Sequence, residues 1–157
     1  MLSVAGKVPE SLRNRLGISV AMRTYQAYRR LLDSPRWQRV FNAGARPQRL
    51  LWASTGTKDP HASDILYVKA LTAPFSVNTI PDNTLNALAQ HTELGSILPA
   101  DGGDSAEVLA EFAKAGVDSD ALAEKLQDDG AKAFVKSWSD LMDVIESKSA
   151  AIQKRVA

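Results

Sequence analysis

The 157-residue sequence contains no cysteine, so disulfide bonds, thiolate metal sites and a cysteine nucleophile are excluded. No stretch approaches the roughly 20 consecutive apolar residues of a membrane span, and the first residues lack the apolar run of a signal peptide. Nineteen basic and eighteen acidic residues leave a net charge of +1, so no global attraction to nucleic acid or anionic lipid arises. We therefore expect a cytoplasmic protein that partners neither nucleic acid nor membrane.

The length suits one domain, and a hydrophobic content of 45% is sufficient for a core. A first helix is predicted by apolar residues at helical spacing, namely Leu16, Val20, Tyr25, Tyr28 and Leu32. Ser34 and Pro35 carry the chemistry of a helix start, which predicts a second, short helix that ends at Gly44.

Two strands are predicted, near residues 49–54 and 76–80. The first contains the unbroken apolar run 50–53, typical of a strand that is buried on both faces of a parallel sheet. A helix over 64–71 separates the strands, and another, with Leu85 and Leu88 inward, follows Pro81. A strand, a helix and a strand within about 30 residues favour a parallel βαβ unit in an α/β fold.

Residues 104–155 are predicted to be helical, with breaks at Gly116 and Gly130. The first of these helices has Val108, Phe112 and Ala115 on its predicted inner face. The last of these helices has a strong amphipathic pattern, made by Phe134, Trp138, Leu141 and Ile145. The tryptophans at 37, 52 and 138 are expected in the core.

The loop 54–58 leaves the carboxyl end of the first strand, the end at which α/β folds bind ligands. Its hydroxyls, glycine and lysine suit a phosphate dianion, although the spacing of a P-loop is missing. The candidate binding residues are Ser54, Thr55, Thr57, Lys58 and, at the mouth of the second strand, Asn78. The alternatives are an ordinary polar turn and, for Asn78, a simple strand end.

No metal site is readable from the sequence, because His61 and His91 have no neighbour at ligand spacing. Neither histidine forms a recognisable nucleophile–base pair. We expect no catalytic residue of these kinds and no cofactor.

The runs Gln48–Lys58, Tyr67–Val68 and Val77–Pro81 resemble the transaldolase family, in the branch with a "QR-x-LWAST-x-x-K" strand and a "VNT-x-P" strand. The resemblance continues in the helix around Tyr25–Gln26 and in the C-terminal helices. It covers nearly the whole chain from about Leu16, so that residues 1–157 are interpreted as a single partial barrel domain.

The resemblance implies a (β/α)₈ barrel enzyme of the pentose phosphate pathway that moves a dihydroxyacetone unit between phosphosugars. The reaction uses a Schiff base on a lysine, without metal or cofactor. The two strands here resemble the seventh and eighth of the barrel. The family's Schiff-base lysine lies on the fourth strand, which falls outside this chain.

Lys7 and Lys58 are the two lysines to consider as Schiff-base nucleophiles within this chain. Lys7, in Lys7-Val8-Pro9, imitates the family's Lys-Ile-Pro motif, but the residues that follow do not continue as the family does, so Lys7 is interpreted as a loop residue. Lys58 is interpreted as a substrate-binding residue rather than a nucleophile, because it lies past the strand on a solvated loop.

Two hypotheses follow. The chain is the C-terminal part of a transaldolase that is inactive alone and assembles with the missing N-terminal barrel half or with itself. Alternatively, it is an inactive fragment or a non-enzymatic module that binds a phosphosugar or a partner. A small helical regulator unrelated to barrels leaves the strand and loop motifs unexplained.

Overall fold

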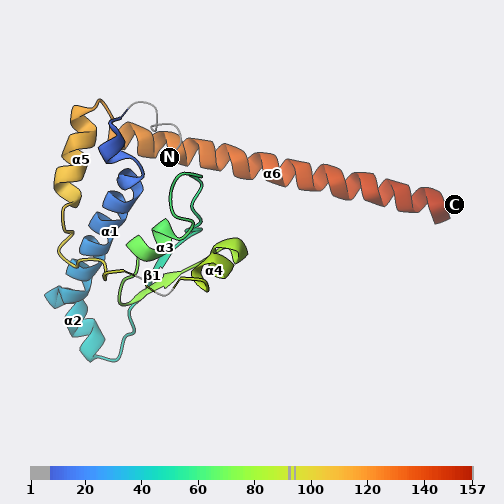
Figure 1. Ribbon diagram of the computed structural model, residues 1–157. Helices are drawn as coiled ribbons and strands as arrows, with labels where there is room; N and C mark the ends of the chain where they lie inside the picture. Colours follow the sequence, from blue (N-terminus) through green and yellow to red (C-terminus); the bar gives the residue numbers. More distant parts are fainter. Residues whose placement is uncertain (1–7, 92, 94, 157) are drawn as a thin grey trace. The chain divides into compact units, whose positions relative to one another are not determined.

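The computed structural model describes residues 8–91, 93 and 95–156 (Figure 1). Its internal contacts divide the chain into two units, Met1–Ala115 and Gly116–Ala157. The first unit holds both strands and all helices but the last, and the second holds a single long helix.

The elements follow one another in the order helix, strand, helix, strand, helix, with further helices at either end. They are the 3-10 helix η1 (Glu10–Leu12), α1 (Arg15–Asp33), α2 (Pro35–Asn42), β1 (Leu50–Trp52), α3 (Leu66–Ala70), β2 (Ser76–Asn78), α4 (Asp82–Leu88), α5 (Ser105–Lys114) and α6 (Ser119–Val156).

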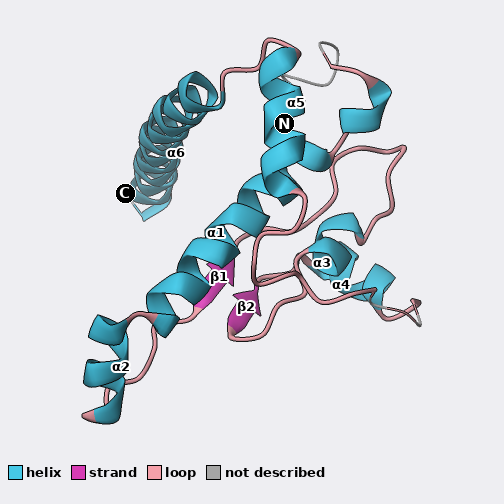
Figure 2. Ribbon diagram, turned by 90° about the vertical axis from the view of Figure 1, so that its left-hand side faces the viewer, coloured by secondary structure: helices cyan, strands magenta, loops and turns pink. Residues whose placement is uncertain are grey.

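The two strands pair in parallel, with Leu50 opposite Ser76 and Trp52 opposite Asn78. Figure 2 shows β1 and β2 among the helices of the first unit. Because α3 lies between them in the chain, the predicted βαβ unit is present. The described structure is mostly helical with two parallel strands, which is consistent with part of a barrel of the (β/α)₈ type.

The core of the first unit is formed by residues of α1, the last residue of β1, the residue that follows α3 and a residue of the loop before α5. Its buried members are Ala21, Met22, Tyr25, Trp52, Leu71 and Leu98. The hydroxyl of Tyr25, a residue only 1% exposed, donates a hydrogen bond of 3.2 Å to the carbonyl oxygen of Pro74 just before β2. Burying a large apolar side chain stabilises a fold by roughly 1.5–3 kcal/mol, so the packing of α1 on Trp52 helps to support the small sheet.

A second layer forms where α5 packs on α1. Val108 and Phe112, the residues predicted to face inward, are 3% and 2% exposed, and Leu12 of η1 is equally buried. This packing fixes the start of α1 close to α5.

The predicted helix start at Ser34 is confirmed. Ser34 caps α2 by accepting a hydrogen bond of 3.2 Å at its Oγ from the backbone N–H of Trp37, and Pro35 occupies the first turn. Gly44 follows with a φ of +97°, a left-handed conformation that suits glycine at a helix end.

The prediction that residues 50–53 are buried on both faces is wrong for Leu51, whose side chain is 51% exposed while Trp52 is 8% exposed. Successive side chains of a strand point to opposite faces, and in the described part of the chain only the face of Trp52 is covered. Leu85 of α4, predicted to face inward, is likewise 51% exposed.

The predicted break at Gly130 is also wrong, because α6 runs without interruption from Ser119 to Val156. One glycine costs a helix only about 1 kcal/mol, which good helix formers on both sides can offset. The apolar stripe predicted for this region is exposed, with Phe134 at 82% and Trp138 at 65%, so Trp138 is not a core residue. None of the helices in the described part of the chain combines the length and apolar character needed to cross a bilayer.

A continuous α6 predicts that Gly130→Ala strengthens the helix locally. A Cβ at residue 130 would meet no heavy atom within 4 Å, and alanine is favoured over glycine by roughly 0.5–1 kcal/mol in a helix. Hydrogen exchange of the backbone amides around residue 130 should slow by about two- to fivefold. The matched control is Gly116→Ala, which should destabilise because Gly116 has a φ of +82°. Faster exchange in Gly130→Ala would contradict a continuous helix.

Candidate functional site

The site forms at the carboxyl ends of the two strands. The ladder between the strands continues past them, since the N–H of Thr79 donates to the carbonyl oxygen of Trp52 at 2.9 Å. The N–H of Thr55 in turn donates to the carbonyl oxygen of Thr79 at 3.4 Å. The loop after β1 is thereby held against the end of β2, the edge at which parallel sheets bind ligands.

Two of the candidate residues meet at this edge. The hydroxyl of Thr55, which is 4% exposed, donates a hydrogen bond of 2.7 Å to the side-chain oxygen of Asn78. The two residues are therefore joined to each other across the strand ends, and this hydroxyl is already used within the protein.

Ser54 stands at a sharp turn. Its φ of +54° is left-handed, which is uncommon and strained for a serine and is found most often at functional sites. Its backbone N–H donates to the hydroxyl of Thr79 at 3.0 Å, and this hydroxyl donates to the carbonyl oxygen of Trp52 at 3.1 Å. The turn leaves the side chain of Ser54 exposed.

Gly56 lies against the start of α4. A Cβ at residue 56 would come within 3.3 Å of the ring of Pro81 and 3.4 Å of the hydroxyl of Thr84, so a side chain fits poorly there. The hydroxyl oxygen of Thr57 is buried and has no hydrogen-bond partner among the described residues. Thr57 therefore does not present its hydroxyl to solvent, unlike Ser54.

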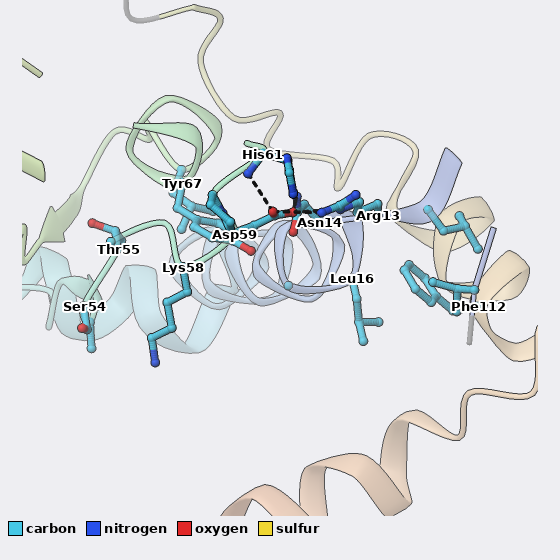
Figure 3. A pocket seen from close by; sticks show the side chains of 17 residues that line it. Arg13, Asn14, Leu16, Ser54, Thr55, Lys58, Asp59, His61, Tyr67 and Phe112 are labelled. Atoms are coloured by element: carbon cyan, nitrogen blue, oxygen red, sulfur yellow. Dashed lines mark hydrogen bonds and ion pairs between the residues drawn. The ribbon is translucent and has the colours of Figure 1, made fainter. Parts of the chain in front are cut away.

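A cavity of about 600 Å³ opens beside this loop (Figure 3). Its walls come from the start of α1, the loop after β1, the α3 region and α5. Ser54, Thr55 and Lys58 line it, whereas Thr57 and Asn78 are not among its lining residues. Lys58 is exposed, and no ion pair engages it in the described part of the chain. Its ammonium group is therefore available to an anion at the rim.

Asp59, next to Lys58, accepts four hydrogen bonds at the cavity wall. Arg13 donates two, from Nε to Oδ2 at 2.9 Å and from Nη2 to Oδ1 at 3.0 Å. Asn14 donates one from Nδ2 to Oδ2 at 2.7 Å, and the backbone N–H of His61 donates one to Oδ1 at 3.0 Å. We call these four groups the Asp59 clamp.

The clamp changes the titration of the groups around it. Hydrogen bonds from Arg13, then from Asn14 and the His61 N–H, hold the pKa of Asp59 well below its usual range. The pKa of Arg13 is raised, chiefly by its hydrogen bonds to Asp59 and Glu10. Burial raises the pKa of Tyr67, and the negative charge of Asp59 adds to this.

Reasoning from sequence missed Arg13, Asn14 and Asp59 as residues of this cavity. Arg13 and Asp59 are 46 positions apart, and Arg13 and Asn14 precede the helix predicted from Leu16, so no periodic pattern connects them. Tyr67 lines the cavity and belongs to the Tyr67–Val68 pair that carried the family resemblance. Lys7 lies outside the described residues.

The described residues contain no group of three or more histidine, aspartate or glutamate side chains that could hold a metal ion.

A parallel βαβ unit with a polar loop and a cavity at its carboxyl ends is the arrangement of α/β ligand-binding proteins. The family model described as "Transaldolase/Fructose-6-phosphate aldolase" matches residues 3–145. The chain belongs to this family, as the resemblance predicted, and the family is one of enzymes.

Relatives of the chain include bacterial proteins named transaldolase. The protein of Parafrankia sp. (strain EAN1pec) is 43% identical over 140 residues, which cover 88% of this chain and 38% of the relative. The protein of Thermobifida fusca (strain YX) is 40% identical over 149 residues, covering 94% of this chain and 40% of the relative. The chain thus spans about two fifths of the length of these relatives.

The contact between Thr55 and Asn78 can be tested by mutation. Thr55→Val keeps the shape but leaves the Asn78 oxygen without its donor, which should lower the free energy of unfolding by about 1–3 kcal/mol. Thr55→Ser keeps the hydroxyl and should cost less than Thr55→Val. Urea unfolding of the three proteins measures the difference. Equal losses in both variants would show that the hydrogen bond contributes little.

The lowered pKa of Asp59 predicts a specific pH dependence. Because the folded-state pKa is lower than the unfolded one, the clamp contributes stability above the unfolded-state pKa, near 4. That contribution is lost progressively as the pH falls from the unfolded-state pKa to the lower, folded-state pKa. The carboxyl carbon of Asp59, followed by NMR, should therefore show no titration midpoint near pH 4, whereas urea-unfolded protein should. A midpoint near 4 in folded protein would contradict the clamp.

Proposed function

We propose that this chain forms the phosphosugar-binding end of a transaldolase. The reaction is the transfer of a dihydroxyacetone unit between phosphosugars of the pentose phosphate pathway, through a lysine Schiff base. The observation that carries the proposal is the loop 54–58 at the carboxyl ends of β1 and β2, beside the cavity, in a chain that belongs to this family.

In this proposal, some residues of the loop contact the phosphate and others hold the loop in shape. Lys58 offers an ammonium group at the cavity rim, and Ser54 offers a hydroxyl that its left-handed turn exposes. A phosphate dianion accepts hydrogen bonds from both, and a charge-assisted hydrogen bond is about twice as strong as a neutral one. Thr55 and Asn78 contribute by shaping the loop, because they are hydrogen-bonded to each other, and the hydroxyl of Thr57 is buried rather than presented to a ligand.

The Schiff-base lysine, in this proposal, lies outside the present chain. A lysine nucleophile needs a desolvated or otherwise tuned environment to be neutral at pH 7. Lys58 is on an exposed loop, which suits charge recognition better than attack on a carbonyl. The chain is accordingly inactive alone and acts with the missing N-terminal barrel half or through self-association, in the cytoplasm that the cysteine-free sequence favours.

A non-enzymatic phosphosugar- or partner-binding module is the second candidate. It is favoured by one observation, the small sheet of the described residues, in which Leu51 is half exposed on a strand of three residues. A two-stranded sheet has open edges whose unpaired backbone groups favour pairing with another strand. A role in binding a partner would therefore require no catalytic activity.

Ligand-dependent stability of the chain tests the proposed binding. Fructose 6-phosphate at about ten times its Kd should raise the free energy of unfolding by roughly 1.4 kcal/mol, and fructose should not. Lys58→Met, which keeps the length of the side chain, should weaken phosphosugar binding by about tenfold or more. Equal effects of fructose and its phosphate would overturn phosphate recognition.

Borohydride reduction in the presence of fructose 6-phosphate tests whether the lysine that forms the Schiff base lies on this chain or outside it. We expect no covalent label on the chain alone, because the nucleophile is proposed to lie elsewhere. A label on Lys58 or Lys7 would overturn that assignment.

A further inference from the structure

Over residues 56–62, the loop after β1 forms its described hydrogen bonds to other elements through Asp59. These bonds all end on the Asp59 carboxylate, and their donors are Arg13 and Asn14. The backbone there forms neither helix nor strand. The conformation of this part of the loop therefore depends on the clamp.

The donors of the clamp are on a rigid base. Arg13 and Asn14 lie between two buried anchors, Leu12 at 2% and Leu16 at 8% exposure. Asn14 has a φ of +60° at the start of α1, a left-handed conformation that asparagine tolerates better than most residues. Because α1 is packed into the core through Ala21, Met22 and Tyr25, the clamp ties the loop to a buried helix of the first unit.

The clamp also determines how Lys58 is presented. Figure 3 shows the Asp59 side chain directed toward Arg13 and Asn14, while Lys58 and Ser54 extend from the loop in a different direction. Lys58 and Asp59 are neighbours in the chain, so fixing one carboxylate by four hydrogen bonds also fixes the backbone that carries the ammonium group.

We propose that Arg13 and Asn14 are positioning residues, which through Asp59 hold the loop 54–61 in its phosphosugar-binding conformation. This inference rests on the proposed function for its ligand. Arg13 itself does not bind the phosphate, because its guanidinium group is engaged by Asp59 and Glu10. Its planar fork, which donates two hydrogen bonds to one carboxylate, cannot be reproduced by lysine.

The test compares Arg13→Lys with Arg15→Lys in the full chain. Arg15 is a matched control, since it starts α1 and forms an ion pair with Asp104 at 2.5 Å, away from the loop. In Arg13→Lys we expect hydrogen exchange of the amides at 56–62 to accelerate by about fivefold or more, and the Kd for fructose 6-phosphate to rise by a similar factor. In Arg15→Lys both quantities should stay at the wild-type values.

A double mutant distinguishes positioning from a general loss of structure. If the clamp acts through Lys58, Arg13→Lys should change the Kd by less than twofold in a Lys58→Met background, while still accelerating exchange of the loop. Additive effects on Kd would overturn the proposal. Asp59→Asn should resemble Arg13→Lys, and if it fails to fold, the milder lysine variant decides.

The two proposals can fail separately. Faster exchange with an unchanged Kd would leave phosphosugar binding intact and show that the clamp does not position the site. If wild-type protein binds no fructose 6-phosphate, the proposed function fails and the ligand part of this inference fails with it. Exchange at 56–62 that is the same in all variants would overturn the clamp itself.

Discussion

The parallel hydrogen bonds between β1 and β2 are the interaction on which the rest of the first unit depends. They bring together the residues after Trp52 and the residues around Asn78, which are more than 20 positions apart in the chain. A sheet of two short strands is marginal by itself. Here Trp52 packs with Tyr25 of α1, whose hydroxyl also reaches the backbone before β2, so one helix supports both strands.

The uncovered side of this sheet has a consequence for assembly. Leu51 of β1 and Phe75 before β2 are both more than half exposed, and the strands have open edges in the described part of the chain. Exposed apolar groups beside unpaired backbone favour contact with further strands. This is the physical basis for proposing a barrel half or a second copy as partner, and it agrees with a chain that matches about two fifths of its relatives.

Local chemistry explains which features could be predicted from the sequence. The two strands, the Ser34 cap and the inward face of α5 each depend on neighbouring residues, and the structure has all three. The meeting of Thr55 with Asn78 also follows, because parallel strands end at one edge. A break at Gly130 is wrong because a helix tolerates a single glycine. Burial of Leu51 is wrong because a short apolar run does not reveal which face of a strand is covered. The Asp59 clamp joins two irregular segments 46 positions apart, which no periodicity can indicate.

The clamp also limits the effect of the negative charge of Asp59 on the neighbouring Lys58. A carboxylate next to Lys58 in the chain would reduce the attraction of the ammonium group for an anion and could itself pair with it. Arg13 and Asn14 occupy both carboxylate oxygens, so the charge of Asp59 is offset by Arg13 and its hydrogen-bonding capacity is largely used. Lys58 is left as a cation without an ion-pair partner in the described chain, beside a cavity whose walls are largely apolar side chains such as Leu16 and Phe112. In the proposed function, the attraction of Lys58 for an anion therefore depends on two residues, Arg13 and Asn14, that do not contact the anion themselves.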